Sequence, residues 1–114
     1  MKIVIETDRL ILREITLDDK EAMFKLHSDP AVQKYTGEPV VESIEEMEQA
    51  IATRIIDHKK YGFGRWATFL KDGMQFVGWA GLAYLPEFDE IDLGYRFLPE
   101  YWGSGIATEA SRAI

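Results

Sequence analysis

Cysteine is absent from the 114-residue sequence. Its absence excludes disulfide bonds, cysteine-ligated metal centres and a thiol nucleophile, and it weakly favours a reducing compartment. Histidine is scarce as well, because only His27 and His58 are present, on separate expected helices and without the spacing of metal ligands. We therefore expect both imidazoles at solvated surface positions, and we expect no metal site.

Long apolar runs and an excess of positive charge are also missing. The longest apolar stretches, such as Phe76 to Leu85, fall far short of the roughly 20 residues of a membrane-spanning helix. The N-terminus shows no signal-peptide pattern, so we expect a cytoplasmic location and no membrane partner.

Asp and Glu number 20 against 13 Lys and Arg, and the formal net charge of −7 repels polyanions. Nucleic acid is therefore not an expected partner, whereas a cationic one such as an amine is mildly favoured.

What remains is the composition of one globular domain over residues 1–114, with 46% hydrophobic and 29% charged residues and no repeat. Its patterns predict an α+β fold with a mainly antiparallel sheet flanked by helices, in the order β-α-α-β-β-β-α. In chain order we expect a strand over 10–15, a helix over 17–27, a helical turn around Ala31 to Tyr35, a helix from the capping box Ser43 and Glu46 to Gly62, two strands within 65–85 joined at Asp72-Gly73, a strand over 90–98 and a helix over 105–114.

The strand over 90–98 has a regular alternation with one interruption. Its apolar face carries Ile91, Leu93, Tyr95 and Phe97, and its other face carries Glu90, Asp92, Gly94 and Arg96. Glycine inside a strand usually marks a bulge or a close backbone approach. A bulge at Gly94 would free main-chain groups for an elongated ligand lying beside the strand.

The stretch "YWGSGIAT", residues 101–108, places Gly103 and Gly105 directly before a helix. The first N–H groups of a helix lack internal partners, so such a turn can bind an anion, and glycines let a phosphate approach closely. The Walker and dinucleotide-binding motifs do not match this stretch. An ordinary strand-to-helix turn remains the alternative. Together with Gly94, the turn indicates a ligand with a peptide-like arm and a diphosphate, which is the shape of coenzyme A.

Three blocks of the sequence resemble the GNAT superfamily of acyl-CoA-dependent N-acetyltransferases, in particular its RimJ/RimL-like branch of ribosomal-protein N-terminal acetyltransferases. They are "TDRLILREITLDDKEAMFKLHSDPAV", "FVGWAGL" and "DLGYRFLPEYWGSGIATEASRAI". The resemblance implies the N-terminal part of that fold and acetyl-CoA as cosubstrate. The implied cofactor-binding residues are Tyr95, Arg96, Phe97 and Leu98, whose main chain would pair with pantetheine, and Tyr101, Trp102, Gly103, Ser104, Gly105, Ile106 and Ala107, whose amides would face the diphosphate.

The resemblance also implies direct attack of a neutral amine on the acetyl thioester, without an acyl-enzyme. Asp92 and Glu90 are the candidate catalytic bases, and solvated carboxylates on an outward strand face are the alternative interpretation. A main-chain N–H near Gly94 or Tyr95 is the candidate oxyanion donor. Glu100 departs from the Gln or Arg usual at its position, which puts a side-chain contribution there in doubt. The acceptor amine is left open.

Superfamily members continue after the last helix with another strand, followed by a tyrosine that often acts as general acid. We therefore expect the strand over 90–98 to expose an edge and the helix over 105–114 to expose an apolar face. The chain would then be a fragment or a truncated protein, or a second copy would cover it as a homodimer. A catalytically inactive interaction or dimerisation module is the alternative function, and a Rossmann-like nucleotide site is the least favoured.

Overall fold

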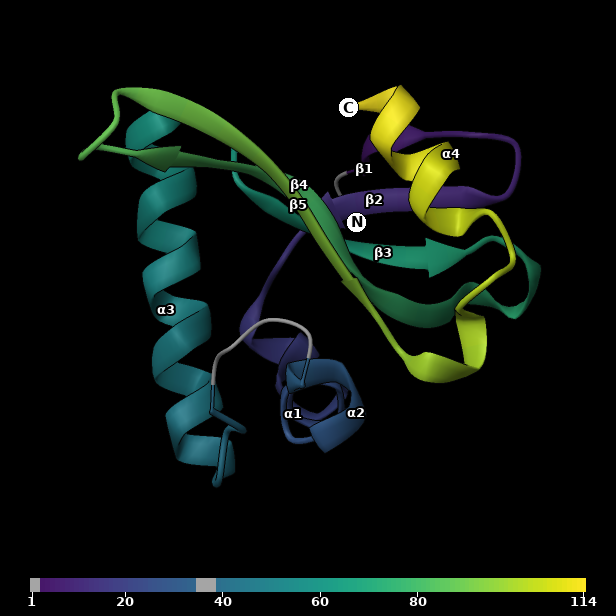
Figure 1. Ribbon diagram of the computed structural model, residues 1–114, viewed down its shortest axis with the longest axis horizontal. Helices are drawn as coiled ribbons and strands as arrows, with labels where there is room; N and C mark the ends of the chain where they lie inside the picture. The colour runs from purple at the N-terminus through teal and green to yellow at the C-terminus, as the bar shows by residue number, and fades with distance from the viewer. Residues whose placement is uncertain (1–2, 35–38) are drawn as a thin grey trace.

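The computed structural model describes residues 3–34 and 39–114. Its centre is a five-stranded antiparallel sheet in the order β1-β2-β3-β4-β5, in which each strand pairs with its neighbour in sequence (Figure 1). The expected α+β architecture is confirmed. The strands are β1 (Ile3–Glu6), β2 (Leu10–Glu14), β3 (Arg65–Leu70), β4 (Gln75–Leu85) and β5 (Glu90–Phe97).

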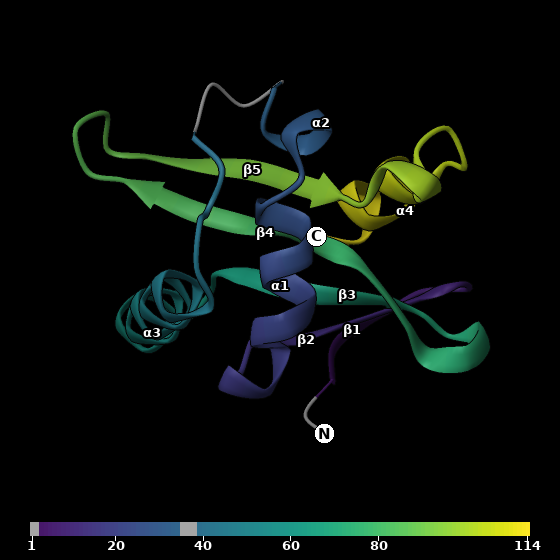
Figure 2. The same ribbon diagram turned by 90° about the horizontal axis from the view of Figure 1, so that it is seen from below.

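The helices within the described residues are α1 (Lys20–His27), α2 (Pro30–Gln33), α3 (Ile44–Tyr61) and α4 (Ile106–Ala113). Figures 1 and 2 show α1 and α3 on one side of the sheet and α4 on the other. Helix α2 accounts for most of the expected turn around Ala31 to Tyr35, and Tyr35 itself lies outside the described residues. Short 3-10 turns (Leu17–Asp19, Asp72–Met74 and Pro99–Tyr101) complete the connections.

Strand β1 was not expected from the sequence. It is four residues long, mostly exposed, and pairs with β2 through an irregular register from Ile3↔Arg13 to Glu6↔Ile11. So short a segment has too little alternation to predict a strand, and its pairing depends on the edge that β2 offers.

The N-terminus of α3 is capped by the residues expected for it. The Ser43 hydroxyl accepts the Glu46 backbone N–H at 3.1 Å, and the Glu46 carboxylate accepts the N–H of Glu42 at 3.1 Å. At the entry to α1, Asp19 accepts the backbone N–H of Thr16 at 2.8 Å and pairs with Arg13 at 2.6 Å. The hydrogen bond to Asp19 raises the pKa of Arg13, opposed in part by burial. This pair ties α1 to β2.

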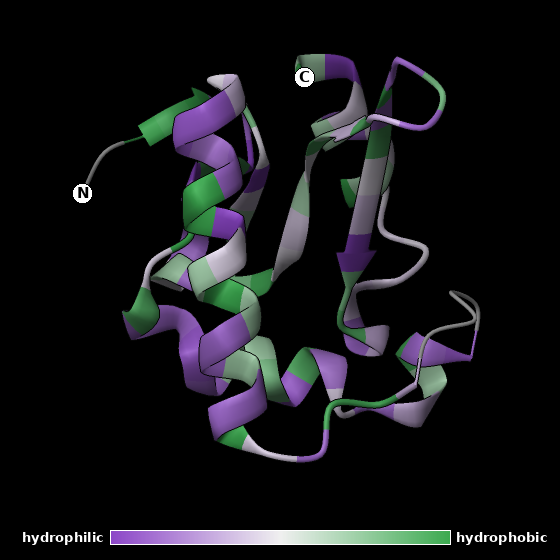
Figure 3. Ribbon diagram, turned by 90° about the vertical axis from the view of Figure 1, so that its left-hand side faces the viewer, coloured by the Kyte–Doolittle hydropathy of each residue, from purple (hydrophilic) through white to green (hydrophobic). Residues whose placement is uncertain are grey.

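Each face of the sheet has its own core. On the α1 and α3 side, Leu26 and Ile51 pack over Phe69 and Trp79. On the α4 side, the buried residues are Leu10, Leu12, Trp66, Val77, Ala80, Phe97, Ile106 and Ala110. Figure 3 shows hydrophobic and hydrophilic residues side by side along α3, as expected for a helix with one buried face.

The expectation that α4 would expose an apolar face is wrong, because Ile106 and Ala110 are buried against the sheet.

Both histidines lie against tryptophans, which corrects the expectation of solvated positions. His27 is 9% exposed, and its Nε2 accepts the indole N–H of Trp79 at 3.2 Å. The Nε2 of His58 accepts the indole N–H of Trp66 at 3.2 Å, while its Nδ1 lies 3.2 Å from the Glu14 carboxylate. The physical reason is that an indole N–H placed in a core needs an acceptor, and a neutral imidazole supplies one.

Gly94 does not sit in a bulge of the β4–β5 pair, contrary to the prediction. The two strands pair without a shift from Gly78↔Phe97 to Leu85↔Glu90. The irregularity lies one strand earlier, between β3 and β4 at Thr68/Phe69. Gly94 pairs with Gly81 and leaves room for the Trp79 ring, 3.7 Å from where a Cβ on Gly94 would stand. Close backbone approaches occur on β4 instead: a Cβ on Gly81 would lie 2.2 Å from the carbonyl oxygen of Gly64, and a Cβ on Gly78 would lie 2.0 Å from that of Arg96.

Helix α4 is held in place through Glu109. Its carboxylate accepts the Thr7 hydroxyl at 2.5 Å, the Arg9 side-chain Nε–H at 2.7 Å and the Arg9 backbone N–H at 3.0 Å. The Thr7 hydroxyl, followed by Arg9, lowers the pKa of Glu109 to about 2, with partial burial acting in the opposite direction. The turn between β1 and β2 is thereby fastened to α4.

We expect Glu109→Gln to destabilise the protein by about 1 kcal/mol near pH 6, discounted for partial exposure. Because the folded state depresses the pKa of Glu109 from 4.5 to about 2, the wild-type advantage is complete above pH 4.5 and is lost as the pH falls toward 2. Urea unfolding from pH 6 to pH 3 measures it. The control is Glu48→Gln, which removes an exposed ion pair with Lys20 and should change little. A gap that does not vary with pH would contradict the assignment.

The register partners Gly81 and Gly94 should lose very different amounts of stability when replaced by alanine. Gly81→Ala forces a Cβ against the Gly64 carbonyl and should cost about 3 kcal/mol, whereas Gly94→Ala makes an ordinary contact with Trp79 and should change stability by less than about 1 kcal/mol. Denaturant midpoints of the two variants compare them directly. Equal losses would show that the close approach at Gly81 is not as described.

Candidate functional site

The turn before α4 has a backbone that only glycine adopts readily. Gly103 has φ +79° and Gly105 has φ +82°, both in the left-handed region. A Cβ on Gly103 would meet nothing within 4 Å, so that position borders open space. A Cβ on Gly105 would stand 3.4 Å from the Arg9 guanidinium. The two glycines therefore shape the turn and keep its outer surface clear of side chains.

This turn presents consecutive backbone donors. The N–H groups of Tyr101 and Trp102 are bonded to the carbonyls of Leu98 and Pro99, and the first helical bond runs from Glu109 N–H to Gly105 at 3.0 Å. Between them, the N–H groups from Gly103 to Thr108 have no acceptor within residues 3–34 and 39–114. These donors surround the positive end of α4, which makes the turn suited to an anion.

Two further contacts fix the shape of the turn. Arg9 donates from its Nη1 to the carbonyl of Ser104 at 3.0 Å, while the Ser104 hydroxyl donates to the carbonyl of Tyr101 at 2.6 Å. The Ser104 side chain is thus used inside the turn. Because Arg9 also binds Glu109, one guanidinium holds the turn and the helix in a single arrangement.

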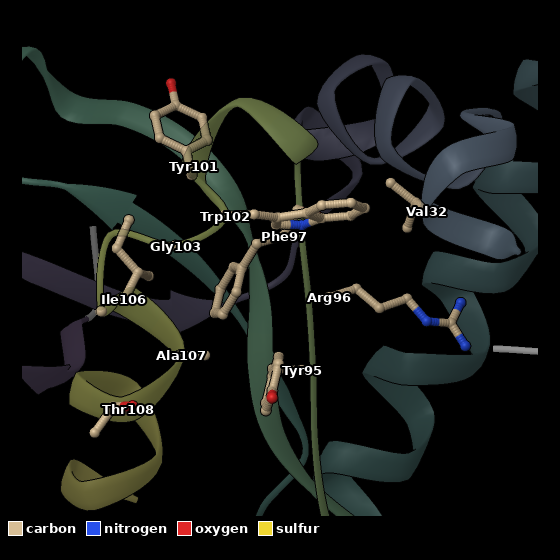
Figure 4. Close-up of a pocket in the computed structure, with 11 residues that line it drawn as sticks. Val32, Tyr95, Arg96, Phe97, Tyr101, Trp102, Gly103, Ile106, Ala107 and Thr108 are labelled. Carbon is tan, nitrogen blue, oxygen red and sulfur yellow. The ribbon is translucent and has the colours of Figure 1, made fainter. Parts of the chain in front are cut away.

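A cleft of about 710 Å³ opens beside these donors, between β5 and α4 (Figure 4). In the figure Phe97 points toward α4 and Arg96 points to the opposite side of β5. Tyr95 and Phe97 stack with ring centroids 5.5 Å apart, and the Trp102 indole N–H donates to the Phe97 carbonyl at 2.8 Å. The cleft thus combines an aromatic strand face with the donors of the turn.

Nine of the eleven residues expected to bind cofactor line this cleft: Tyr95, Arg96, Phe97, Tyr101, Trp102, Gly103, Gly105, Ile106 and Ala107. Leu98 is buried beneath it, with its N–H bonded to the carbonyl of Val77, and Ser104 turns inward. The sequence interpretation missed Thr108 and Val32. Thr108 could have been found as the next residue of the first helical turn. Val32 had no signal, because only the fold brings α2 to the cleft.

The candidate bases Asp92 and Glu90 lie outside the cleft lining. Both are exposed near the end of the β4–β5 hairpin, where Asp92 pairs with Ala83 and Glu90 with Leu85. Residues two apart on a strand point to the same face, so Asp92 shares a face with Gly94 and with Arg96. Arg96 pairs with Trp79, and paired residues also share a face, so this is the face that Trp79 occupies, opposite the α4 side.

On that second face Arg96 joins a polar cluster. Its Nη1 lies 3.2 Å from His27 Nδ1 and donates to the Gln33 side-chain oxygen at 3.3 Å. Its guanidinium stands 5.5 Å from the centre of the Trp79 ring. Arg96 therefore belongs both to the cleft lining and to the buried cluster behind it.

Neither a metal centre nor a membrane span is found in the part of the chain that the structure describes. Over residues 3–34 and 39–114, no three acidic or histidine side chains are arranged to hold a metal ion. Within the same ranges, no helix combines the length and the apolar character needed to cross a bilayer.

Three comparisons relate this chain to known proteins. It is 36% identical over 107 residues to the uncharacterized N-acetyltransferase YoaA of Bacillus subtilis strain 168, covering 93% of this chain and 60% of YoaA. A GNAT-family acetyltransferase structure from Bacillus anthracis matches with a TM-score of 0.75 and 26% identity, over 99% of this chain and 63% of that one. RimL, a ribosomal L7/L12 alpha-N-protein acetyltransferase in complex with coenzyme A, matches with a TM-score of 0.77, over 98% of this chain and 64% of RimL. Its identity of 20% supports the shared fold alone.

The chain spans 60% of the length of YoaA and 50% of that of an acetyl coenzyme A-dependent FsC transacetylase from Aspergillus fumigatus, which is 31% identical. Residues 9–114 match the family described as the acetyltransferase (GNAT) domain, which is nearly the whole chain. With the antiparallel sheet and the glycine turn in place, the chain belongs to the GNAT acetyltransferase family.

Proposed function

We propose that this chain binds acetyl-CoA in the cleft between β5 and α4 and takes part in acetyl transfer to a primary amine. The observation that carries the proposal is the run of backbone donors from Gly103 to Thr108 at the mouth of the cleft. A diphosphate is the anion that such a run suits, because its several oxygens can each accept an N–H. CoA is the diphosphate ligand of RimL, which shares this fold.

The remaining length of CoA would follow β5. No further strand lies beyond β5 in residues 3–34 and 39–114, so its outer backbone edge is open to the amides of pantetheine. Tyr95 is 51% exposed and, with Phe97, offers an apolar surface to the pantetheine chain. The thioester would then lie near Gly94, where the strand lacks a side chain.

The reaction consists of attack by the amine nitrogen on the thioester carbonyl, in which a C–N bond forms and the C–S bond breaks. An ammonium substrate loses two protons, one of which ends on the departing thiolate and the other in solvent. We assign the removal of the first proton to Asp92, with Glu90 beside it and water as the carrier. Both lie on the face of β5 that carries Gly94, and a main-chain N–H near Gly94 or Tyr95 would stabilise the developing oxyanion.

The exposed face of β5 favours a second candidate function. Ile91 and Leu93 are 57% and 46% exposed, and Tyr95 extends the same apolar row. A homodimer that covers this row would make the chain an interaction module with or without catalysis. Light scattering separates the two functions, because the module requires a stable dimer, and a CoA-binding monomer would count against it.

The test of CoA binding is Gly103→Asp. Aspartate tolerates the left-handed backbone, and its carboxylate among the donors would repel the diphosphate. We expect calorimetry to show CoA affinity reduced by about tenfold or more. Gly103→Asn, which has the same shape without the charge, should lose less.

Gly62→Asp is the matched control. Gly62 has φ +78° and, like Gly103, nothing within 4 Å of a Cβ, but it ends α3 far from the cleft. It should leave CoA affinity unchanged. The proposal fails if wild-type protein does not bind CoA, or if the Gly103 and Gly62 variants bind it equally.

A further inference from the structure

Strand β5 combines an open edge with an apolar row. Figure 2 shows β5 at one edge of the sheet, and within residues 3–34 and 39–114 it pairs with β4 alone. The side chains of Ile91, Leu93 and Tyr95, on the face of β5 that Phe97 shares, are each about half exposed. An open strand edge beside exposed apolar side chains is a surface that another strand can cover.

Hydrogen bonds at the end of β5 show which of its main-chain groups face outward. The N–H of Leu98 donates to the carbonyl of Val77 on β4 at 2.9 Å, whereas the carbonyl of Phe97 accepts the indole N–H of Trp102 at 2.8 Å. Successive residues of an antiparallel strand bond alternately to one side and to the other. The residues whose N–H and C=O groups point away from β4 are therefore Ile91, Leu93 and Tyr95.

This outward set is complementary to itself, because it is symmetric about Leu93. When a second copy runs antiparallel with its Leu93 opposite Leu93, the Ile91 of each copy lies opposite Tyr95 of the other. Every outward N–H of these residues then has an outward C=O as its acceptor. The apolar side chains meet on one face of the joined sheet, where directly opposite pairs stabilise each other.

Charge favours this register over the next one toward the β4–β5 hairpin. In the register just described, Glu90 lies opposite Arg96 of the second copy, so the two charges are of opposite sign. Asp92 lies opposite Gly94. The next register would place Asp92 opposite itself, and like charges directly opposite destabilise a strand pair. The match uses only the sign of the Arg96 charge, and Arg96 keeps its hydrogen bond to Gln33.

The end of β5 disfavours the next register in the other direction. That register would be centred on Gly94 and would place Ile91 opposite Phe97. The Phe97 carbonyl already accepts the Trp102 indole, so the N–H of Ile91 would have to share that acceptor. Leu93 at the centre is therefore the register that suits this edge best.

From this symmetry we propose that two copies of the chain pair antiparallel through their β5 edges, centred on Leu93, and that the second copy and CoA exclude each other. The pairing rests on β5 alone, whereas the exclusion also rests on the proposed function, in which pantetheine bonds to the main chain of Tyr95. The N–H and C=O of Tyr95 cannot serve pantetheine and Ile91 of a second copy together. CoA binding therefore converts the dimer to monomers.

Disulfide cross-linking tests the register, because the chain contains no cysteine. Leu93→Cys places a thiol opposite its own copy, at a Cα separation of about 5.5 Å that a disulfide can bridge. After mild oxidation without CoA, we expect most of this variant to run as a covalent dimer on a non-reducing gel. Ile91→Cys is the matched control from the same row, because its two copies are offset by about 13 Å along the strands. It should cross-link at least about tenfold more slowly.

Sedimentation equilibrium measures the association itself. Leu93→Lys puts a charge at the centre of the edge and should weaken dimerisation at least about tenfold relative to wild type. Ile56→Lys makes the same replacement at an exposed residue of α3 and should leave dimerisation unchanged. Thermal melts identify a variant that does not fold, and cross-linking of Leu93→Cys carries the test if Leu93→Lys is one.

Titration of the wild-type dimer with CoA tests the exclusion. CoA at ten times its own Kd should raise the apparent Kd of the dimer about a hundredfold, because both copies must release the edge. Ile56→Lys should respond to CoA as wild type does.

The two proposals can fail separately. A wild-type chain that stays monomeric without CoA, or equal cross-linking of the Leu93 and Ile91 variants, would overturn the pairing. A dimer that persists unchanged in protein saturated with CoA would overturn the exclusion. Absence of CoA binding would count against the proposed function and the exclusion that rests on it, while sedimentation and cross-linking judge the pairing without CoA.

Discussion

The contact of Arg9 with both Glu109 and the Ser104 carbonyl holds the functional end of the molecule together. It joins the turn between β1 and β2 to α4 and to the glycine turn in one network. Without it, the left-handed residues Gly103 and Gly105 would have many conformations open to them, and the backbone donors would not converge. The proposed anion site is therefore made by backbone geometry, and the charged side chains serve to keep that geometry.

The sheet separates two kinds of chemistry. On the α4 side, the cleft is made of strand backbone, aromatic rings and the start of a helix. On the α3 side, the charged and polar side chains of Arg65, Arg96 and His27 contact the Trp79 ring. Strands β3, β4 and β5 contribute to both sides, and in β5 the alternation sends Phe97 to the α4 side and Arg96 to the other.

The sequence by itself determined the elements other than β1, the α+β architecture, the N-terminal cap of α3 and the glycine turn, since these depend on periodicity and on neighbouring residues. It also placed most of the cleft lining, because those residues are contiguous along β5 and the start of α4. Tertiary structure alone decided the rest. The indole N–H groups of Trp79 and Trp66 take the imidazoles of His27 and His58 as acceptors, and the sheet has its irregular register between β3 and β4 instead of at Gly94. Val32 lines the cleft only because the fold brings α2 beside β5, a contact that no local pattern encodes.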